Sequence, residues 1–125
     1  MIKALIVGVG GFCGATLRYL IGLLAHRLSG GHWFPHGTLT VNVVGCFLIG
    51  LIVALGESKG FLSHNLHLFL VIGLLGGFTT FSSFGHETAV LFRNAQTGAV
   101  FLNVFLHFFL CFIAVFIGHE LGKVL

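Results

Sequence analysis

The sequence predicts an all-α membrane protein with four transmembrane helices, the third of them broken at its centre. Hydrophobic residues make up 57% of the 125 residues and charged residues only 7%, too few to keep a soluble domain of this length in solution. Apolar runs cover about residues 4–25, 38–56, 66–92 and 98–118, and each is close to the ~20 residues that a helix needs to cross a bilayer. Because these runs use most of the sequence, we expect residues 1–125 to form a single four-helix transmembrane domain in a lipid bilayer.

The first span carries Gly10, Gly14 and Arg18 at every fourth position, so the three share one face of the predicted helix. Glycines at this spacing allow a second helix to approach closely, which favours helix packing. An arginine at this depth costs about 2.5–3.5 kcal/mol on insertion scales, and Arg18 must therefore face protein or water. Two interpretations stay open: its guanidinium caps carbonyls at a helix junction, or it attracts an anion.

The second span places Thr38, Asn42 and Cys46 on one face by the same spacing. A buried amide without a hydrogen-bond partner is costly in hydrocarbon, so Asn42 needs one. It either bridges two helices or lines a hydrated path through the membrane.

The third span contains the stretch that predicts the break. Gly76 and Gly77 followed by β-branched Thr79 and Thr80 disfavour a continuous helix. Irregular backbone at membrane depth is tolerated only where it is buried in protein or lines a cavity. Carbonyls at such a break can bind a cation, and the amino end of a half-helix can bind an anion. The break is therefore the predicted functional centre.

Beyond the break, Phe81, Phe84 and Glu87 follow at three-residue spacing and share a helix face. Rings at this spacing usually belong to a core. These two are interleaved with hydroxyl residues, however, and the positive edge of an aromatic ring can meet a small anion without a full charge that would trap it.

The fourth span places Asn103, His107 and Cys111 on one ridge. The histidines show no metal-ligand spacing such as HExxH, so we interpret His107 as a hydrogen-bonding residue that faces a pore. No Walker loop or nucleophile–base–acid set occurs, and we expect no enzymatic activity. The six Lys and Arg residues are scattered, which does not predict nucleic-acid binding.

Loop charges give almost no preferred orientation. One side of the membrane receives Lys3, Lys59 and Lys123, and the other receives Arg27 and Arg93. Either another feature fixes the orientation, or the chain inserts in both directions. Insertion in both directions would allow an antiparallel homodimer.

Three blocks of sequence, at residues 10–19, 37–47 and 73–84, resemble the small bacterial fluoride channels called Fluc or CrcB proteins. The resemblance covers all four spans, and the block GLLGGFTTFSSF is its most specific part. It implies an antiparallel homodimer of four-helix subunits in the bacterial plasma (inner) membrane, which exports cytoplasmic fluoride passively and so lowers its toxicity.

The resemblance also implies roles for particular residues. Phe81 and Phe84 look like the two pore phenylalanines whose ring edges contact fluoride. Asn42 looks like the pore asparagine, and Thr40 like a nearby polar pore position. The backbone carbonyls of Gly76 and Thr79, one pair from each subunit, look like ligands of a structural sodium ion.

Further positions also match the family. His107 and Cys111 occupy its polar track on the fourth helix, although many relatives have serine at the second position and a thiol is a weaker donor than a hydroxyl. Glu87 is similar to a glutamate proposed to assist ion movement. Arg18 matches an arginine that is structural or attracts anions to the pore entrance.

Two other functions compete. A small proton-coupled multidrug transporter has a similar size, but it needs a carboxylate deep in its first helix, where this chain offers only Arg18. A non-transporting assembly subunit would explain the glycine ridges but not Asn42, Thr79 or the break.

Overall fold

The structure is a computed structural model that describes residues 1–30 and 34–125, and in this part of the chain all regular structure is helical. Four spans are long and apolar enough to cross a membrane, which confirms the predicted fold class. The first two are α1 (Ile2–Leu28) and α2 (His36–Lys59), and the fourth is α6 (Thr97–Val124). The third is composite and consists of α3 (His64–His67), the π-helix η1 (Leu68–Leu75), α4 (Gly76–Phe78) and α5 (Phe81–Arg93).

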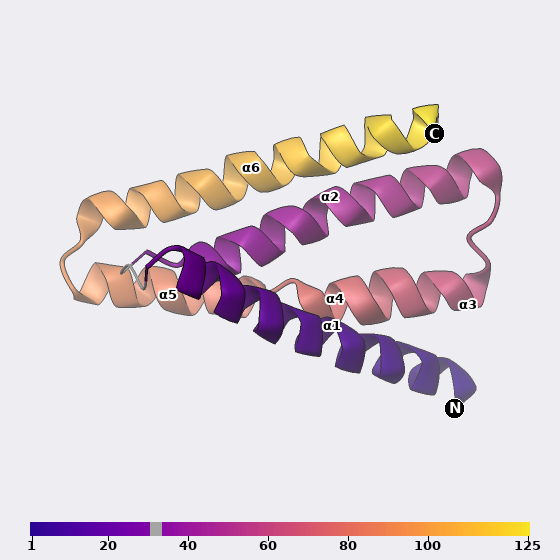
Figure 1. The fold of residues 1–125 in the computed structure, drawn as a ribbon, viewed down its shortest axis with the longest axis horizontal. Helices are drawn as coiled ribbons and strands as arrows, with labels where there is room; N and C mark the ends of the chain where they lie inside the picture. Colours follow the sequence, from indigo (N-terminus) through magenta and orange to yellow (C-terminus); the bar gives the residue numbers. More distant parts are fainter. Residues whose placement is uncertain (31–33) are drawn as a thin grey trace.

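The spans alternate in direction, so both termini lie at the same end of the bundle as the α2–α3 connection (Figure 1). The helices run a few residues beyond the apolar stretches of the sequence at most of their ends. Most large apolar side chains of α1 and α6 are exposed, Phe12 and Phe116 among them. Exposed apolar helix surface of this kind is stable in contact with lipid rather than water.

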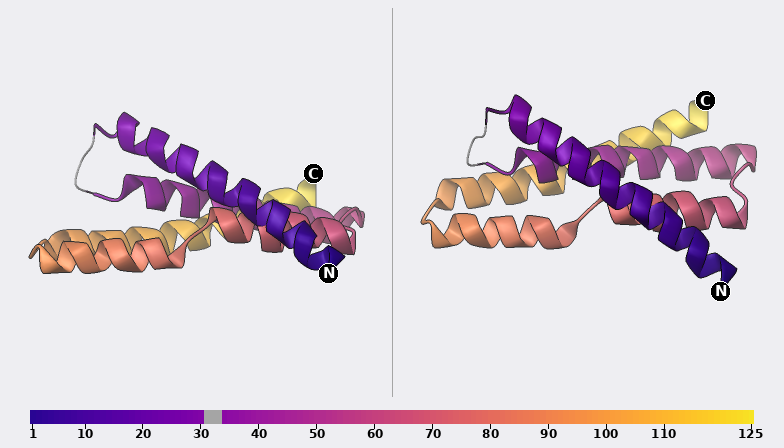
Figure 2. Two further views of the ribbon diagram at one scale, coloured as in Figure 1. Left: turned by 90° about the horizontal axis from the view of Figure 1, so that it is seen from below. Right: turned by 60° about the horizontal axis from the view of Figure 1, so that its bottom comes forward.

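α1 crosses the third span obliquely and packs against η1 and α4 (Figure 2). Glycines on both sides make this close approach possible. A Cβ atom added at Gly14 would lie 2.8 Å from the Phe78 nitrogen, and one at Gly77 would lie 2.6 Å from the Gly11 oxygen. Since real Cβ contacts are not this short, the two backbones leave no room for a side chain. The helix-packing interpretation of Gly14 is confirmed.

α2 packs along α6 by the same device. A Cβ atom at Gly50 would lie 2.9 Å from the His119 nitrogen, and one at Gly118 would lie 3.0 Å from the Leu51 nitrogen. The bundle thus contains two glycine-mediated helix pairs: α1 with the third span, and α2 with α6.

The predicted break is present (Figures 1 and 2). α4 ends at Phe78, Thr79 is extended with φ −83° and ψ 159°, and Thr80 is the N-cap of α5. The Thr80 Oγ1 accepts a hydrogen bond of 3.1 Å from the Ser83 backbone N–H, which satisfies one of the donors that a helix start leaves open. Threonine at this position therefore fixes where the second half-helix begins.

The π-helix before the break was not predicted. Residues 68–75 are apolar at every position except Gly73, so the pattern could not distinguish a period of 3.6 from a wider one. A π-helical turn is rare and frequently lies beside a functional site.

Candidate functional site

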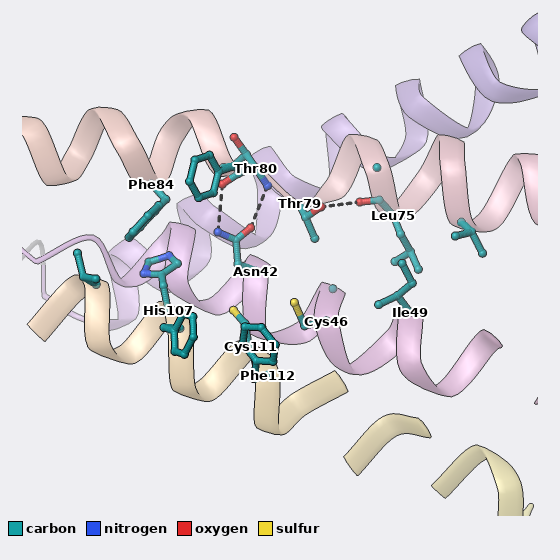
Figure 3. A pocket seen from close by; sticks show the side chains of 16 residues that line it. Asn42, Cys46, Ile49, Leu75, Thr79, Thr80, Phe84, His107, Cys111 and Phe112 are labelled. Atoms are coloured by element: carbon teal, nitrogen blue, oxygen red, sulfur yellow. Dashed lines mark hydrogen bonds between the residues drawn. The ribbon is translucent and has the colours of Figure 1, made fainter. Parts of the chain in front are cut away.

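Asn42 from α2 is hydrogen-bonded to the backbone at the break in the third span. Its Nδ2 donates to the Thr80 carbonyl at 3.1 Å, and its Oδ1 accepts from the Thr80 N–H at 2.9 Å (Figure 3). Asn42 is only 8% exposed and Thr80 only 9%. The amide therefore has the partner that its burial requires, and this partner lies on another helix.

This arrangement releases two carbonyls from helical bonding. In an unbroken helix the Thr80 N–H would bond to the Gly76 carbonyl, but here it donates to Asn42. The Ser83 N–H would bond to the Thr79 carbonyl, but here it donates to the Thr80 Oγ1. These two carbonyls are among those that the break leaves without a helical donor, and the family resemblance assigns this pair to sodium.

Backbone oxygens of this kind suit a hard cation. The described residues contain no group of three or more His, Cys, Asp or Glu side chains that could hold a metal ion. A cation at this site would therefore rest on the carbonyls of Gly76 and Thr79, and the chemistry of these donors fits sodium.

A cavity of about 500 Å³ lies between α2, α6 and the break, and we call it the central cavity (Figure 3). Its lining is largely apolar, and it is open to the outside of the single chain, since the lining residue Phe81 is 83% exposed. The residues that line it are Asn42, Gly45, Cys46, Ile49, Val71, Leu75, Gly76, Thr79, Thr80, Phe81, Phe84, Val104, His107, Phe108, Cys111 and Phe112.

Three rings stand in a row along this cavity. The ring centroids of Phe81 and Phe84 are 5.4 Å apart with an interplanar angle of 52°. Phe84 lies 4.4 Å from the His107 ring at 41°. The ring contacts thus connect exposed Phe81 on α5, through Phe84, to His107 on α6.

The orientation of His107 is set by its own helix. Its Nδ1 lies 3.0 Å from the Asn103 carbonyl, and because a carbonyl only accepts, Nδ1 carries the hydrogen. Nε2 is buried and has no hydrogen-bond partner among the described residues. Asn103 in turn donates to the Thr88 Oγ1 at 2.9 Å and so connects α6 to α5.

A second cavity, of about 520 Å³, lies on the other side of Thr80, and we call it the polar cavity. Arg18 and Glu87 both line it. The Thr38 hydroxyl donates to the Glu87 Oε1 at 2.5 Å, while Oε2 is buried without a partner among the described residues. Thr80 lines both cavities, so the break forms the boundary between an apolar and a charged compartment.

The structure divides the residues that the sequence singled out. The central cavity contains Asn42, Gly76, Thr79, Phe81, Phe84, His107 and Cys111. Arg18 and Glu87 lie in the polar cavity. Thr40 lines neither cavity and is exposed on α2.

Sequence reasoning missed the position of Thr80 at the boundary. A threonine three residues before Ser83 and just after Gly-rich backbone is a helix N-cap signal. That signal could have identified Thr80 as the start of α5.

The fold and these two cavities define a class: a small multi-pass membrane protein whose polar groups gather at a break in its third span. The chain belongs to the CrcB family, because the family model described as "CrcB-like protein, Camphor Resistance (CrcB)" matches residues 5–119. It is thereby a multi-pass bacterial membrane protein.

Curated relatives carry a consistent name, fluoride-specific ion channel FluC. The relative from Clostridium perfringens is 42% identical over 125 residues, which cover 100% of this chain and 97% of the relative. The relative from Agrobacterium fabrum is 44% identical and is covered over 99% of its length. A third, from Rhizobium etli, is 50% identical over 99 residues, or 79% of this chain and 78% of the relative.

Proposed function

We propose that this chain is a fluoride-specific ion channel that exports cytoplasmic fluoride passively. The family and the name of its full-length relatives support the proposal. The observation that carries it is the central cavity, where Phe81, Phe84 and Asn42 meet beside a helix break in the middle of a membrane span.

The central cavity offers weak but well-placed positive groups to an anion. The ring edges of Phe81 and Phe84 are electropositive, and the amino end of α5 adds its partial positive charge. The Asn42 amide has two N–H bonds, of which the Thr80 carbonyl takes one. Because no Lys or Arg is among the described residues that line this cavity, fluoride would bind there without being trapped by a full positive charge.

His107 and Cys111 continue this path along α6. The Asn103 carbonyl accepts from the His107 Nδ1, which leaves Nε2 as the ring nitrogen without a partner among the described residues. The Cys111 thiol is a weak donor. In the polar cavity, Arg18 attracts the anion and Glu87 takes part in its passage at the entrance.

The membrane potential supplies the driving force. Fluoride enters cells as neutral HF and ionises at cytoplasmic pH, after which the anion cannot return through lipid. An inside-negative potential favours anion exit by about 2.3 kcal/mol per 100 mV. A passive channel is therefore sufficient, and the chain needs no energy-coupling domain.

Each chain would form one four-helix domain over residues 1–125, and two such chains an antiparallel homodimer. The open side of the central cavity supports this arrangement, because exposed Gly76 and Phe81 would there be covered by the partner. Exposed Thr40 would face the partner in the same way. A structural sodium ion held by the Gly76 and Thr79 carbonyls of both subunits would neutralise converging dipoles at the two-fold axis.

Reconstitution in liposomes tests the function. Fluoride efflux is measured with a fluoride electrode. Chloride efflux, and uptake of a cationic dye driven by a proton gradient, are measured in parallel. We expect fluoride efflux far above chloride efflux and no dye transport. Equal fluoride and chloride leakage would overturn the channel proposal, and proton-driven dye uptake would support the multidrug transporter.

A further inference from the structure

Two thiols from different helices meet inside the central cavity. Cys46 on α2 and Cys111 on α6 both line the cavity, and their side chains lie close enough to interact with one another. Both are free thiols and both are partly buried. Figure 3 shows the two sulfur atoms beside each other in the pocket. A molecule that entered the cavity would therefore meet a dithiol rather than a single cysteine.

The surroundings decide what this dithiol can bind. The nearby walls are the side chains of Ile49, Phe108 and Phe112. A low-dielectric site of this kind disfavours any complex with net charge. The polar side chains in the cavity lining are those of Asn42, Thr79, Thr80 and His107, and no Lys, Arg, Asp or Glu is among the described residues that line it.

We propose that Cys46 and Cys111 form a two-coordinate binding site for a thiophilic metal cation, and that the bound metal blocks the central cavity. Sulfur ligands select soft metals, and the thiolate is the form that binds. With Hg²⁺ as the probe, each sulfur releases its proton and forms one bond to the metal, so two thiols and one Hg²⁺ give a mercury bis-thiolate and two protons. The product is neutral, as the apolar cavity requires.

The third cysteine provides the matched control. Cys13 lies on α1 and lines neither cavity. It can take up the metal only as a single thiol, and a competing monothiol in solution displaces a singly bound metal readily. Two linked thiols hold the metal far more tightly, because the second bond forms at an effective concentration in the ~mM range or above.

Binding is measured on the detergent-solubilised, fully reduced protein by the ultraviolet absorption of the metal–thiolate bonds, in the presence of a monothiol competitor. We expect the wild type and Cys13→Ala to retain one Hg²⁺ per chain. We expect Cys46→Ala and Cys111→Ala each to lose at least about tenfold in affinity, the advantage of chelation. Tight binding that survives in either of these variants, or that disappears in Cys13→Ala, would overturn the site. The serine variants repeat the test if an alanine variant does not fold.

Blockade is measured as fluoride efflux from liposomes containing Cys13→Ala, before and after Hg²⁺ and after reversal by a dithiol. This part of the inference rests on the proposed function, whereas the binding measurement does not. We expect Hg²⁺ to abolish efflux and the dithiol to restore it. Efflux that continues in metal-loaded protein would overturn the blockade. Untreated protein without fluoride efflux would overturn the proposed function and leave the binding result standing.

Discussion

The Asn42 side chain and the Thr80 peptide group form a reciprocal pair of hydrogen bonds, of 3.1 Å and 2.9 Å, across two helices. The Asn42 Oδ1 takes the place of the Gly76 carbonyl, to which the Thr80 N–H would bond in a continuous helix. It also leaves the Gly76 carbonyl available, because the amide has taken its donor. The Asn42 side chain thus gives the Thr80 N–H a partner and leaves the Gly76 carbonyl free to bind another group.

Asn42→Ala is expected to destabilise the protein markedly. It leaves the buried N–H of Thr80 without its partner, and an unsatisfied buried donor costs about 1–3 kcal/mol. Asn42→Asp restores the acceptor for the N–H but places an oxygen against the Thr80 carbonyl, so it should recover less than the full loss. Thermal unfolding in detergent measures both, with exposed Asn65→Ala as the control. An Asn42→Ala protein that unfolds at the wild-type temperature would contradict this account.

Two glycines on α1 should respond in opposite ways to alanine. At Gly14 the new Cβ would lie 2.8 Å from the Phe78 nitrogen, and overpacking of this kind costs about 1–3 kcal/mol. At Gly8 it would meet nothing within 4 Å among the described residues, and alanine in a helix is about 0.5–1 kcal/mol better than glycine. Thermal stability should therefore fall for Gly14→Ala and hold or rise for Gly8→Ala. Similar shifts in the two variants would show that α1 does not depend on close contact with the third span.

The break in the third span could be predicted because its causes are local. Glycine and β-branched threonine weaken a helix wherever they stand, and four apolar runs are visible without knowledge of any contact. The need of Asn42 for a partner was likewise predictable from the cost of a buried amide. The identity of that partner was not, because Thr80 is 38 residues away.

The division of the site into two cavities depends on tertiary packing and left no trace in the spacing of the residues. Glu87 follows Phe84 by three positions and shares its helix face, yet Phe84 lines the central cavity and Glu87 the polar cavity. Thr40 was identified from the family resemblance alone, and in the single chain it is exposed. Its surroundings in a dimer would be set by contacts with a second copy, which the spacing of residues in one chain does not encode.

Phe81→Ile and Phe84→Ile are expected to remove most of the fluoride flux. Isoleucine keeps an apolar side chain but has no electropositive ring edge, so desolvated fluoride would lose a stabilising contact. A loss of about tenfold or more corresponds to about 1.4 kcal/mol in the barrier. Phe81 is 83% exposed in the single chain, so its variant should still fold into the four-helix subunit.

The control for the ring variants is Phe92→Ile, on the same helix α5, with 69% exposure and no place in either cavity. Its efflux should match the wild type. Normal efflux from both Phe81→Ile and Phe84→Ile would return these rings to a packing role.

Terminal tags are expected on both sides of the membrane. Lys3, Lys59 and Lys123 gather at the end of the bundle that holds both termini, against Arg27 and Arg93 at the other. A difference this small gives weak orientation. Two lysines added next to Arg27 should bias insertion and reduce fluoride efflux, and a copy biased the other way should restore it. A wild-type population labelled from one side only would contradict the antiparallel dimer.

Replacement of sodium by N-methylglucamine is expected to weaken the dimer, because this large cation cannot occupy a cage formed by the Gly76 and Thr79 carbonyls. The proposed ligand is the Thr79 backbone carbonyl, and serine keeps both this carbonyl and the hydroxyl that donates to the Leu75 carbonyl at 3.0 Å, so Thr79→Ser should keep the sodium dependence. A Cβ atom at Gly76 would have only the Val71 oxygen, at 3.8 Å, as a neighbour among the described residues. Gly76→Leu should therefore fold as a single chain but fill the space between two copies and lose the sodium dependence. The dimer fraction in each cation, measured by cross-linking in detergent, checks these expectations. An equal dimer fraction in both cations for the wild type would refute the sodium site and leave the fluoride pathway untouched.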